Sequence, residues 1–147
     1  MRCADAGLRF AKVPDVLLRW RDHAGRLSRI DRRYRPDAFS RVKADALARG
    51  PLAGAAPVII WGAGQTGRRL ARHLLGSGVR IEAFVDIDDA KIGRSYRGAP
   101  TLPPSELAAH RDRFVLAAVA ARGARRLIRE RVCELGWQEG LDFWCTA

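Results

Sequence analysis

Pro57-Val-Ile-Ile-Trp-Gly-Ala-Gly-Gln-Thr-Gly67 is the stretch that decides the fold of this 147-residue chain. Its first part, Val58–Trp61, is a short run of apolar and β-branched residues and predicts a fully buried strand. Gly62, Gly64 and Gly67 follow in G-x-G-x-x-G spacing, and a helical pattern begins there. In a tight turn from strand to helix, the first glycine permits the turn, the second lets a ligand approach the backbone, and the third allows close packing. The stretch therefore predicts a Rossmann-like βαβ unit.

The glycine turn is also a candidate nucleotide site. The N-terminus of the helix that follows it offers unpaired N–H groups and the positive end of a dipole, which suit a phosphate. The residues that we expect to contact a nucleotide here are Gly62, Ala63, Gly64, Gln65, Thr66 and Gly67.

An acidic residue follows the next predicted strand, Ile81–Val85. Asp86 stands 19 residues after Gly67, where a carboxylate can accept hydrogen bonds from a ribose diol. Asp88 lies in the same loop and is a further candidate. A carboxylate at this place would favour NAD over NADP because it repels a 2′-phosphate. The alternative interpretation is that Asp86 only begins a loop, since aspartates favour turns.

The rest of the second half continues the α/β pattern. Phe114–Val119 is an apolar run without alternation, as in a strand of a covered parallel sheet, and residues 140–145 can supply a final edge strand. Residues 57–147 are thus predicted to form a small α/β, Rossmann-like three-layer domain with a mostly parallel sheet. Arg122, beyond the Phe114–Val119 strand, could clamp a phosphate opposite the glycine turn, although a solvated arginine is the simpler alternative.

The sequence pattern of residues 1–50 predicts a strand–helix extension and not an independent domain. The strand is expected over Val13–Trp20, and the helix begins at Pro36 and stops at Gly50-Pro51. One strand and one helix bury too little apolar surface to stand alone. Residues 51–56, small and bounded by proline, are predicted to be a linker.

Composition restricts the class of protein. The net charge is +11, and 24 of the 27 basic residues are arginine. Such a charge can attract nucleic acid or anionic lipid, but no recognition-helix, RNP-like or zinc-finger pattern accompanies it, so we expect no specific nucleic-acid binding.

The cysteines and histidines predict neither a disulfide framework nor a metal site. Cys3, Cys133 and Cys145 form no C-x-x-C pair, and the three histidines are scattered. The odd number of cysteines without such a pair favours a reducing cytoplasm, and the sequence shows neither a signal-peptide core nor an apolar run long enough to span a membrane.

No catalytic machinery is visible in the sequence. Paired carboxylates, a nucleophile elbow and a Cys/His dyad are all missing from the pattern. We therefore predict no catalytic residue in this chain, and the residues alone indicate a binding domain.

Two family resemblances rest on longer stretches. Val13-Pro-Asp-Val-Leu-Leu-Arg-Trp-Arg-Asp-His-Ala-Gly-Arg-Leu-Ser-Arg29, within residues 8–50, resembles the C-terminal edge of the catalytic domain of bacterial family 2 glycosyltransferases. Residues 57–147 resemble the small Rossmann-like domain fused behind some of these transferases. They are also similar to the nucleotide-binding domains of sugar-nucleotide dehydratases and sugar O-acyltransferases. The matching stretches are Ile59–Gly67, Phe84-Val-Asp-Ile-Asp, Lys91-Ile-Gly, Gly98-Ala-Pro and Phe114–Val119.

The resemblance implies an auxiliary domain that binds a nucleotide or nucleotide-sugar for a glycosyltransferase of bacterial surface-polysaccharide synthesis. Its partner would be the transferase catalytic domain, in cis or in trans, at the inner face of the plasma membrane. The catalytic half of such a transferase has no counterpart here, and Met1 is the only methionine, so we expect a fragment or a reading frame begun at an internal methionine. The alternatives are an NAD-binding, oxidoreductase-like domain or a docking module without a ligand. A homodimer is compatible with each interpretation.

Overall fold

The computed structural model describes residues 6–9, 11–54 and 56–147, and it divides into two compact units, Met1–Ala38 and Phe39–Ala147. In the first unit, the described residues form α2 (Leu27–Ile30), the 3-10 helix η1 (Arg32–Tyr34) and the beginning of α3 (Pro36–Arg49). The predicted helix over residues 36–49 is thus confirmed.

The strand expected over Val13–Trp20 is not formed, so this part of the prediction is wrong. The whole stretch lies outside helices and strands, and Val16, Leu17 and Leu18 are 81%, 76% and 76% exposed. A strand needs a neighbour to satisfy its backbone groups, and none of the six strands in the described part of the chain lies in the first unit. An apolar run without such a partner has nothing to pair with.

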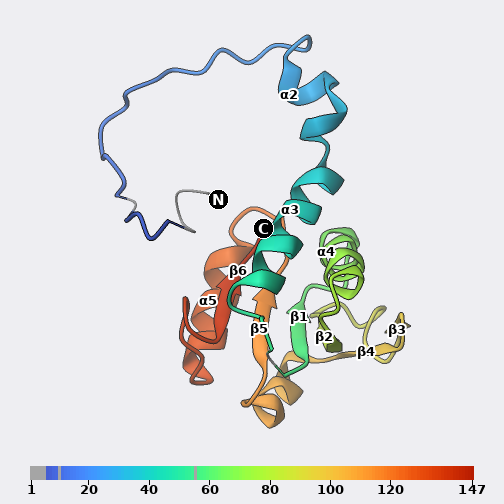
Figure 1. Ribbon diagram of the computed structural model, residues 1–147. Helices are drawn as coiled ribbons and strands as arrows, with labels where there is room; N and C mark the ends of the chain where they lie inside the picture. The colour runs from blue at the N-terminus through green and yellow to red at the C-terminus, as the bar shows by residue number, and fades with distance from the viewer. Residues whose placement is uncertain (1–5, 10, 55) are drawn as a thin grey trace. The chain divides into compact units, whose positions relative to one another are not determined.

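The second unit is built on a six-stranded sheet of order β3-β4-β2-β1-β5-β6 (Figure 1). The predicted βαβ unit is confirmed as β1 (Val58–Trp61), α4 (Gln65–Gly76) and β2 (Ile81–Val85), with β1 parallel to β2. Beyond it, β5 (Phe114–Ala117) and the predicted edge strand β6 (Phe143–Cys145) are also parallel to their neighbours. The short pair β3 (Ser95–Tyr96) and β4 (Ala99–Leu102) is the antiparallel exception in this sheet.

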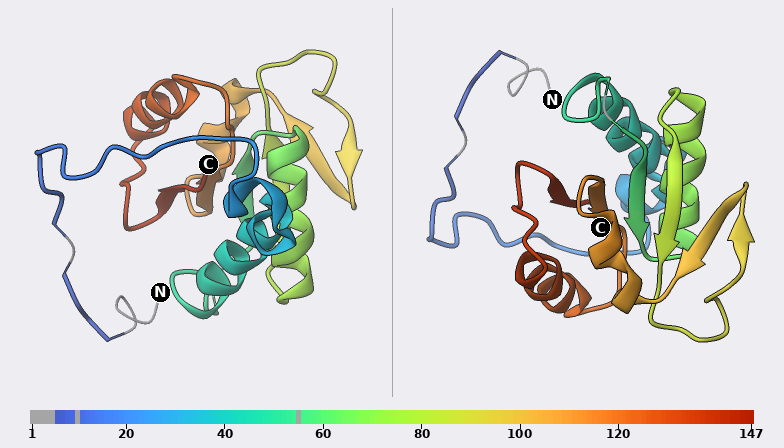
Figure 2. Two further views of the ribbon diagram at one scale, coloured as in Figure 1. Left: turned by 90° about the horizontal axis from the view of Figure 1, so that it is seen from above. Right: turned by 90° about the horizontal axis from the view of Figure 1, so that it is seen from below.

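Helices cover both faces of this sheet, so the predicted three layers are confirmed (Figure 2). Alternate residues of β1 face opposite sides: Val58 and Ile60 belong to one core, and Ile59 and Trp61 belong to the other. The first core contains residues of α4 together with Ala44, Leu47 and Leu52. The second contains residues of the 3-10 helix η2 (Pro104–His110), of α5 (Ala124–Glu134) and of β6. The assignment of residues 1–50 to a transferase domain, and of 51–56 to a linker, stays a prediction.

Gly67 is the point at which α4 packs most closely on the turn that precedes it. A Cβ atom at this position would lie 1.8 Å from the carbonyl oxygen of Gly62, which is backbone and cannot rotate away. The close approach of helix and turn therefore depends on the missing side chain.

We expect Gly67→Ala to lower the free energy of unfolding by about 2 kcal/mol, because such overpacking forces backbone shifts. Urea unfolding followed by circular dichroism measures the change. Gly76→Ala is the matched control, since a Cβ at the end of the same helix meets nothing within 4 Å. Equal stability of the two variants would contradict this account of Gly67.

Candidate functional site

The order of the strands in the sheet creates a crevice at the carboxyl ends of the strands. From β1 the chain passes to β2 and β4 on one side and then returns to β5 on the other side. The loops after β1 and β5 therefore diverge, and in such sheets ligands bind at the carboxyl ends of the strands at this point. A cavity of about 560 Å³ lies here. Its lining comes from the turns after β1, β2 and β5 and from α5, and includes Trp61, Gly62, Gly64, Gln65, Thr66, Asp86, Ile87, Asp88, Lys91, Val119, Leu127, Ile128 and Arg131.

The three glycines of the turn differ in what the fold requires of them. Gly62 has a φ of +117°, and a Cβ there would lie 2.8 Å from Cγ2 of Val119, so the turn requires glycine. Gly67 is required by helix packing, as described above. Gly64, in contrast, has an ordinary φ of −80°, and a Cβ there would meet nothing within 4 Å. The missing side chain of Gly64 leaves room in the cavity without serving the fold.

The N-terminus of α4 presents unpaired amides at the same place. The N–H of Arg68 is the first that donates to a carbonyl of the helical turn, that of Gly64, at 3.0 Å. The amides of Gln65, Thr66 and Gly67 come before it and have no acceptor within the helix. Together with the helix dipole, these amides form a site that suits an anion.

Asp86 ties the loop after β2 to the glycine turn. Its side chain is almost fully buried, and its Oδ2 accepts a hydrogen bond from the N–H of Ala63 at 2.8 Å. Its Oδ1 accepts one from the N–H of Asp88 at 3.1 Å. These bonds compensate the cost of burying a carboxylate and fix the turn in position.

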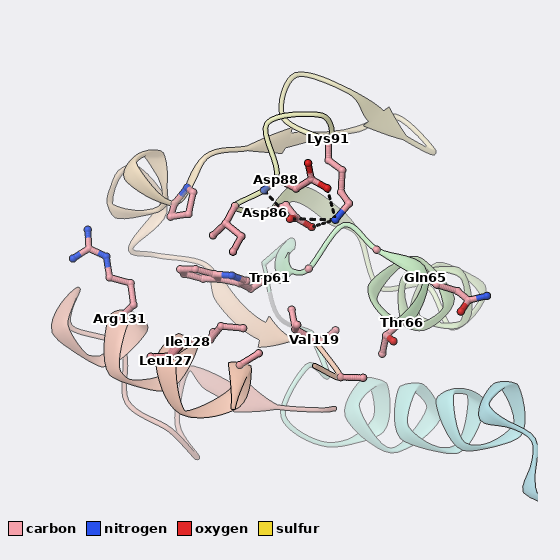
Figure 3. Close-up of a pocket in the computed structure, with 17 residues that line it drawn as sticks. Trp61, Gln65, Thr66, Asp86, Asp88, Lys91, Val119, Leu127, Ile128 and Arg131 are labelled. Carbon is pink, nitrogen blue, oxygen red and sulfur yellow. Dashed lines mark hydrogen bonds and ion pairs between the residues drawn. The ribbon is translucent and has the colours of Figure 1, made fainter. Parts of the chain in front are cut away.

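Lys91 supplies the counter-charge of this acidic loop (Figure 3). Its Nζ lies 3.3 Å from Oδ2 of Asp86 and 3.1 Å from Oδ2 of Asp88. The hydrogen bond to Asp88 raises the pKa of Lys91, and the same bond lowers the pKa of Asp88. Both groups are therefore charged at neutral pH. Sequence reasoning missed the role of Lys91, although its spacing from the two aspartates places it in the same loop.

The other wall of the cavity is apolar. Trp61 is the last residue of β1 and lies in the middle of the cavity lining. Leu127 and Ile128 of α5 lie on one side of it, and the acidic loop lies on the other (Figure 3). Ile87 of that loop is largely exposed and also lines the cavity. A flat apolar group can lie between these side chains, while the polar groups described above remain at its edge.

The structure brings most of the predicted residues together. Gly62, Gly64, Gln65, Thr66, Asp86 and Asp88 line the cavity, Ala63 lines an adjoining one, and Gly67 is buried beneath the turn. Arg122, the predicted phosphate clamp, is exposed and lines neither cavity. The arginine that the fold does bring to the rim is Arg131, one turn beyond Leu127 on α5.

Within the described ranges, no group of three His, Cys, Asp or Glu side chains could hold a metal ion. None of the helices in these ranges combines the length and the apolar character of a membrane span.

Comparison with known proteins supports the fold. No protein-family model and no curated protein matches the chain. The solved structure of RSP, a Rex-family repressor, is 15% identical over 69% of this chain and 57% of its own, with a TM-score of 0.52. RSP in complex with beta-NADH gives a TM-score of 0.51 at 15% identity, over 69% of this chain and 58% of that chain. UDP-D-quinovosamine 4-dehydrogenase from Vibrio fischeri is 27% identical over 55% of this chain and 72% of its own, with a TM-score of 0.49.

The residues that match the RSP structures thus span less than two thirds of those chains. The likeness confirms the Rossmann-like class of the fold, and none of these matches supports the expected kinship with family 2 glycosyltransferases.

We expect Asp86→Asn to lower the free energy of unfolding by about 1–3 kcal/mol, because the new amide group cannot accept hydrogen bonds from both backbone amides. Differential scanning calorimetry measures the loss. Asp88→Asn is the control and should have a smaller effect, since 46% of the Asp88 side chain is exposed and an exposed ion pair contributes little. An equal loss in the two variants would show that Asp86 does not hold the turn.

Proposed function

We propose that residues 57–147 bind a nucleotide that carries a diphosphate. The observation that supports this proposal most directly is Gly64. The fold does not need glycine at this position, yet its Cα faces the cavity beside the unpaired amides of α4. A glycine that the fold can spare is explained by a ligand that touches the backbone there.

The parts of a nucleotide match the parts of the cavity. The diphosphate would lie on the amides of Gln65 and Thr66, which line the cavity. The ribose hydroxyls would lie against the loop of Asp86 and Asp88, where carboxylates accept hydrogen bonds. The base would fit the apolar space beside α5. A volume of about 560 Å³ is in the range of small-molecule sites.

Among nucleotides, a dinucleotide of the NAD type is our first choice. The cavity continues from the helix N-terminus past the acidic loop to α5, which gives a long ligand contacts along its length. A protein of similar fold, RSP, has been solved in complex with beta-NADH, which makes this ligand the first to test. A nucleotide-sugar would use the same diphosphate contacts and is the second choice.

The wider context is a separate part of the proposal. Service to a glycosyltransferase of polysaccharide synthesis, and a place at the inner face of the plasma membrane, rest on the resemblance of residues 8–50 alone. The same holds for a transferase catalytic domain as the partner. Hexosyl transfer itself is assigned to no residue of this chain.

We expect the melting temperature of the chain to rise with NAD, a nucleoside diphosphate or a UDP-sugar, because a ligand that binds only the folded state stabilises it. Gly64→Val should remove this rise, since its side chain would fill the space of the ligand. The unliganded variant should still fold, at a cost of about 1 kcal/mol for an apolar N-cap. A thermal-shift screen measures both effects.

Gly76→Ala serves as the control in this screen and should keep the response of the natural sequence, since it lies at the far end of α4. A folded protein that responds to none of these ligands at millimolar concentration would refute nucleotide binding. A docking module without a ligand would then be the remaining interpretation.

A further inference from the structure

A second cavity, of about 450 Å³, adjoins the first on the other side of the α4 N-terminus. Its lining is strongly basic and contains no acidic side chain: Ala63, Gly64, Gln65, Arg68, Arg69, Arg72, Lys91 and Tyr96. Three of these residues, Gly64, Gln65 and Lys91, also line the first cavity. The two cavities therefore share a wall, and one ligand can reach from the first into the second.

Arg68 is held in this second cavity by an aromatic ring. Its guanidinium carbon lies 5.4 Å from the ring centre of Tyr96, within the range of a cation–π contact. Tyr96 itself packs edge-on against the buried Phe84, with 5.9 Å between the ring centres. The arginine is thus held by the ring, and its planar group has little freedom to lose when it binds a ligand.

Arg68 also carries a donor without an acceptor. Its Nε is buried and has no hydrogen-bond partner in the described part of the chain. A buried donor without a partner is costly and unusual in a folded protein, and a bound ion or water is one way to satisfy it. Arg69 lines the same cavity, and none of the ion pairs between described residues joins either arginine to a carboxylate.

Lys91, unlike Arg68 and Arg69, is paired with carboxylates. It is paired with Asp86 and Asp88, so it offsets the repulsion that these carboxylates would exert on an anion nearby. From the sequence, Asp86 is expected to repel a phosphate on the ribose, but that expectation considers the carboxylate without the paired ammonium group of Lys91. Arg68 and Arg69, which pair with no carboxylate in the described part of the chain, keep their charge for a ligand.

We infer that the nucleotide of the first cavity bears an additional phosphate on its ribose, and that Arg68 and Arg69 bind this phosphomonoester in the second cavity. The inference rests on the proposed nucleotide site and adds the class of its ligand. The ribose would lie beside Lys91, in the wall that the two cavities share, and its phosphate would point toward the arginines. Guanidinium groups suit a phosphate because their donors match its oxygens in pairs.

Pairs of ligands that differ by this one phosphate test the inference on the 147-residue chain. NAD and NADP form one pair, and dephospho-coenzyme A and coenzyme A form the other. Isothermal titration calorimetry should show that the phosphorylated member binds about tenfold more tightly or better, since hydrogen bonds to charged groups are strong. This advantage should shrink as the salt concentration rises.

The double variant Arg68→Gln/Arg69→Gln should abolish the advantage of the phosphorylated member and leave the affinity for the other member unchanged. The matched control is Arg49→Gln/Arg80→Gln, which removes the same charge from two exposed positions outside both cavities. The control should keep the full advantage. Gly64→Val, in contrast, should weaken the binding of both members.

Two results would overturn this inference and leave the proposed function intact: equal affinities within each pair, or an advantage that survives in Arg68→Gln/Arg69→Gln. The basic cavity would then be a solvated face of α4. If no member of either pair binds to the folded chain, the inference is also refuted. Nucleoside diphosphates and UDP-sugars, tested in the same way, then decide whether the proposed function itself stands.

Discussion

The hydrogen bond from the N–H of Ala63 to the buried carboxylate of Asp86 is the interaction on which the site depends. It joins the turn after β1 to the loop after β2. Because the turn is held at this point, α4 begins with its unpaired amides directed toward the cavity. Hydrogen bonds within the protein thus hold the glycine turn, which lowers the cost of ordering it when a ligand binds.

The local chemistry of the sequence was sufficient for the βαβ unit. Buried strands, a glycine turn and an amphipathic helix each carry a short-range signal, and all three indicate the same fold. For the β3–β4 hairpin, the glycine- and proline-rich segment from Lys91 to Pro104 indicated only a loop with short extended pieces, because strands as short as these show no periodicity. Its turn, Arg97-Gly98, has positive φ at both residues, which is typical of a tight hairpin. The stretch Val13–Trp20 shows the opposite failure, since an apolar pattern forms no strand without a neighbour.

The candidate site was predictable only in part, for a physical reason. The glycine turn and the two aspartates lie within short segments whose spacing fixes their roles. The apolar wall from α5, however, reaches the cavity only because β5 lies beside β1, and this adjacency is tertiary. Arg122, the predicted phosphate clamp, lines neither cavity, whereas α5 brings Arg131 to the wall of the first one, and this placement is tertiary as well.

Lys91 belongs to the walls of both cavities, and this has a thermodynamic consequence. Whatever occupies one cavity changes the partners that the ammonium group can offer to the other. The two halves of the site are then coupled, and linkage requires the coupling to be reciprocal. Occupants that compete for the lysine would show negative cooperativity, whereas a single molecule that spans both cavities would gain from both at once.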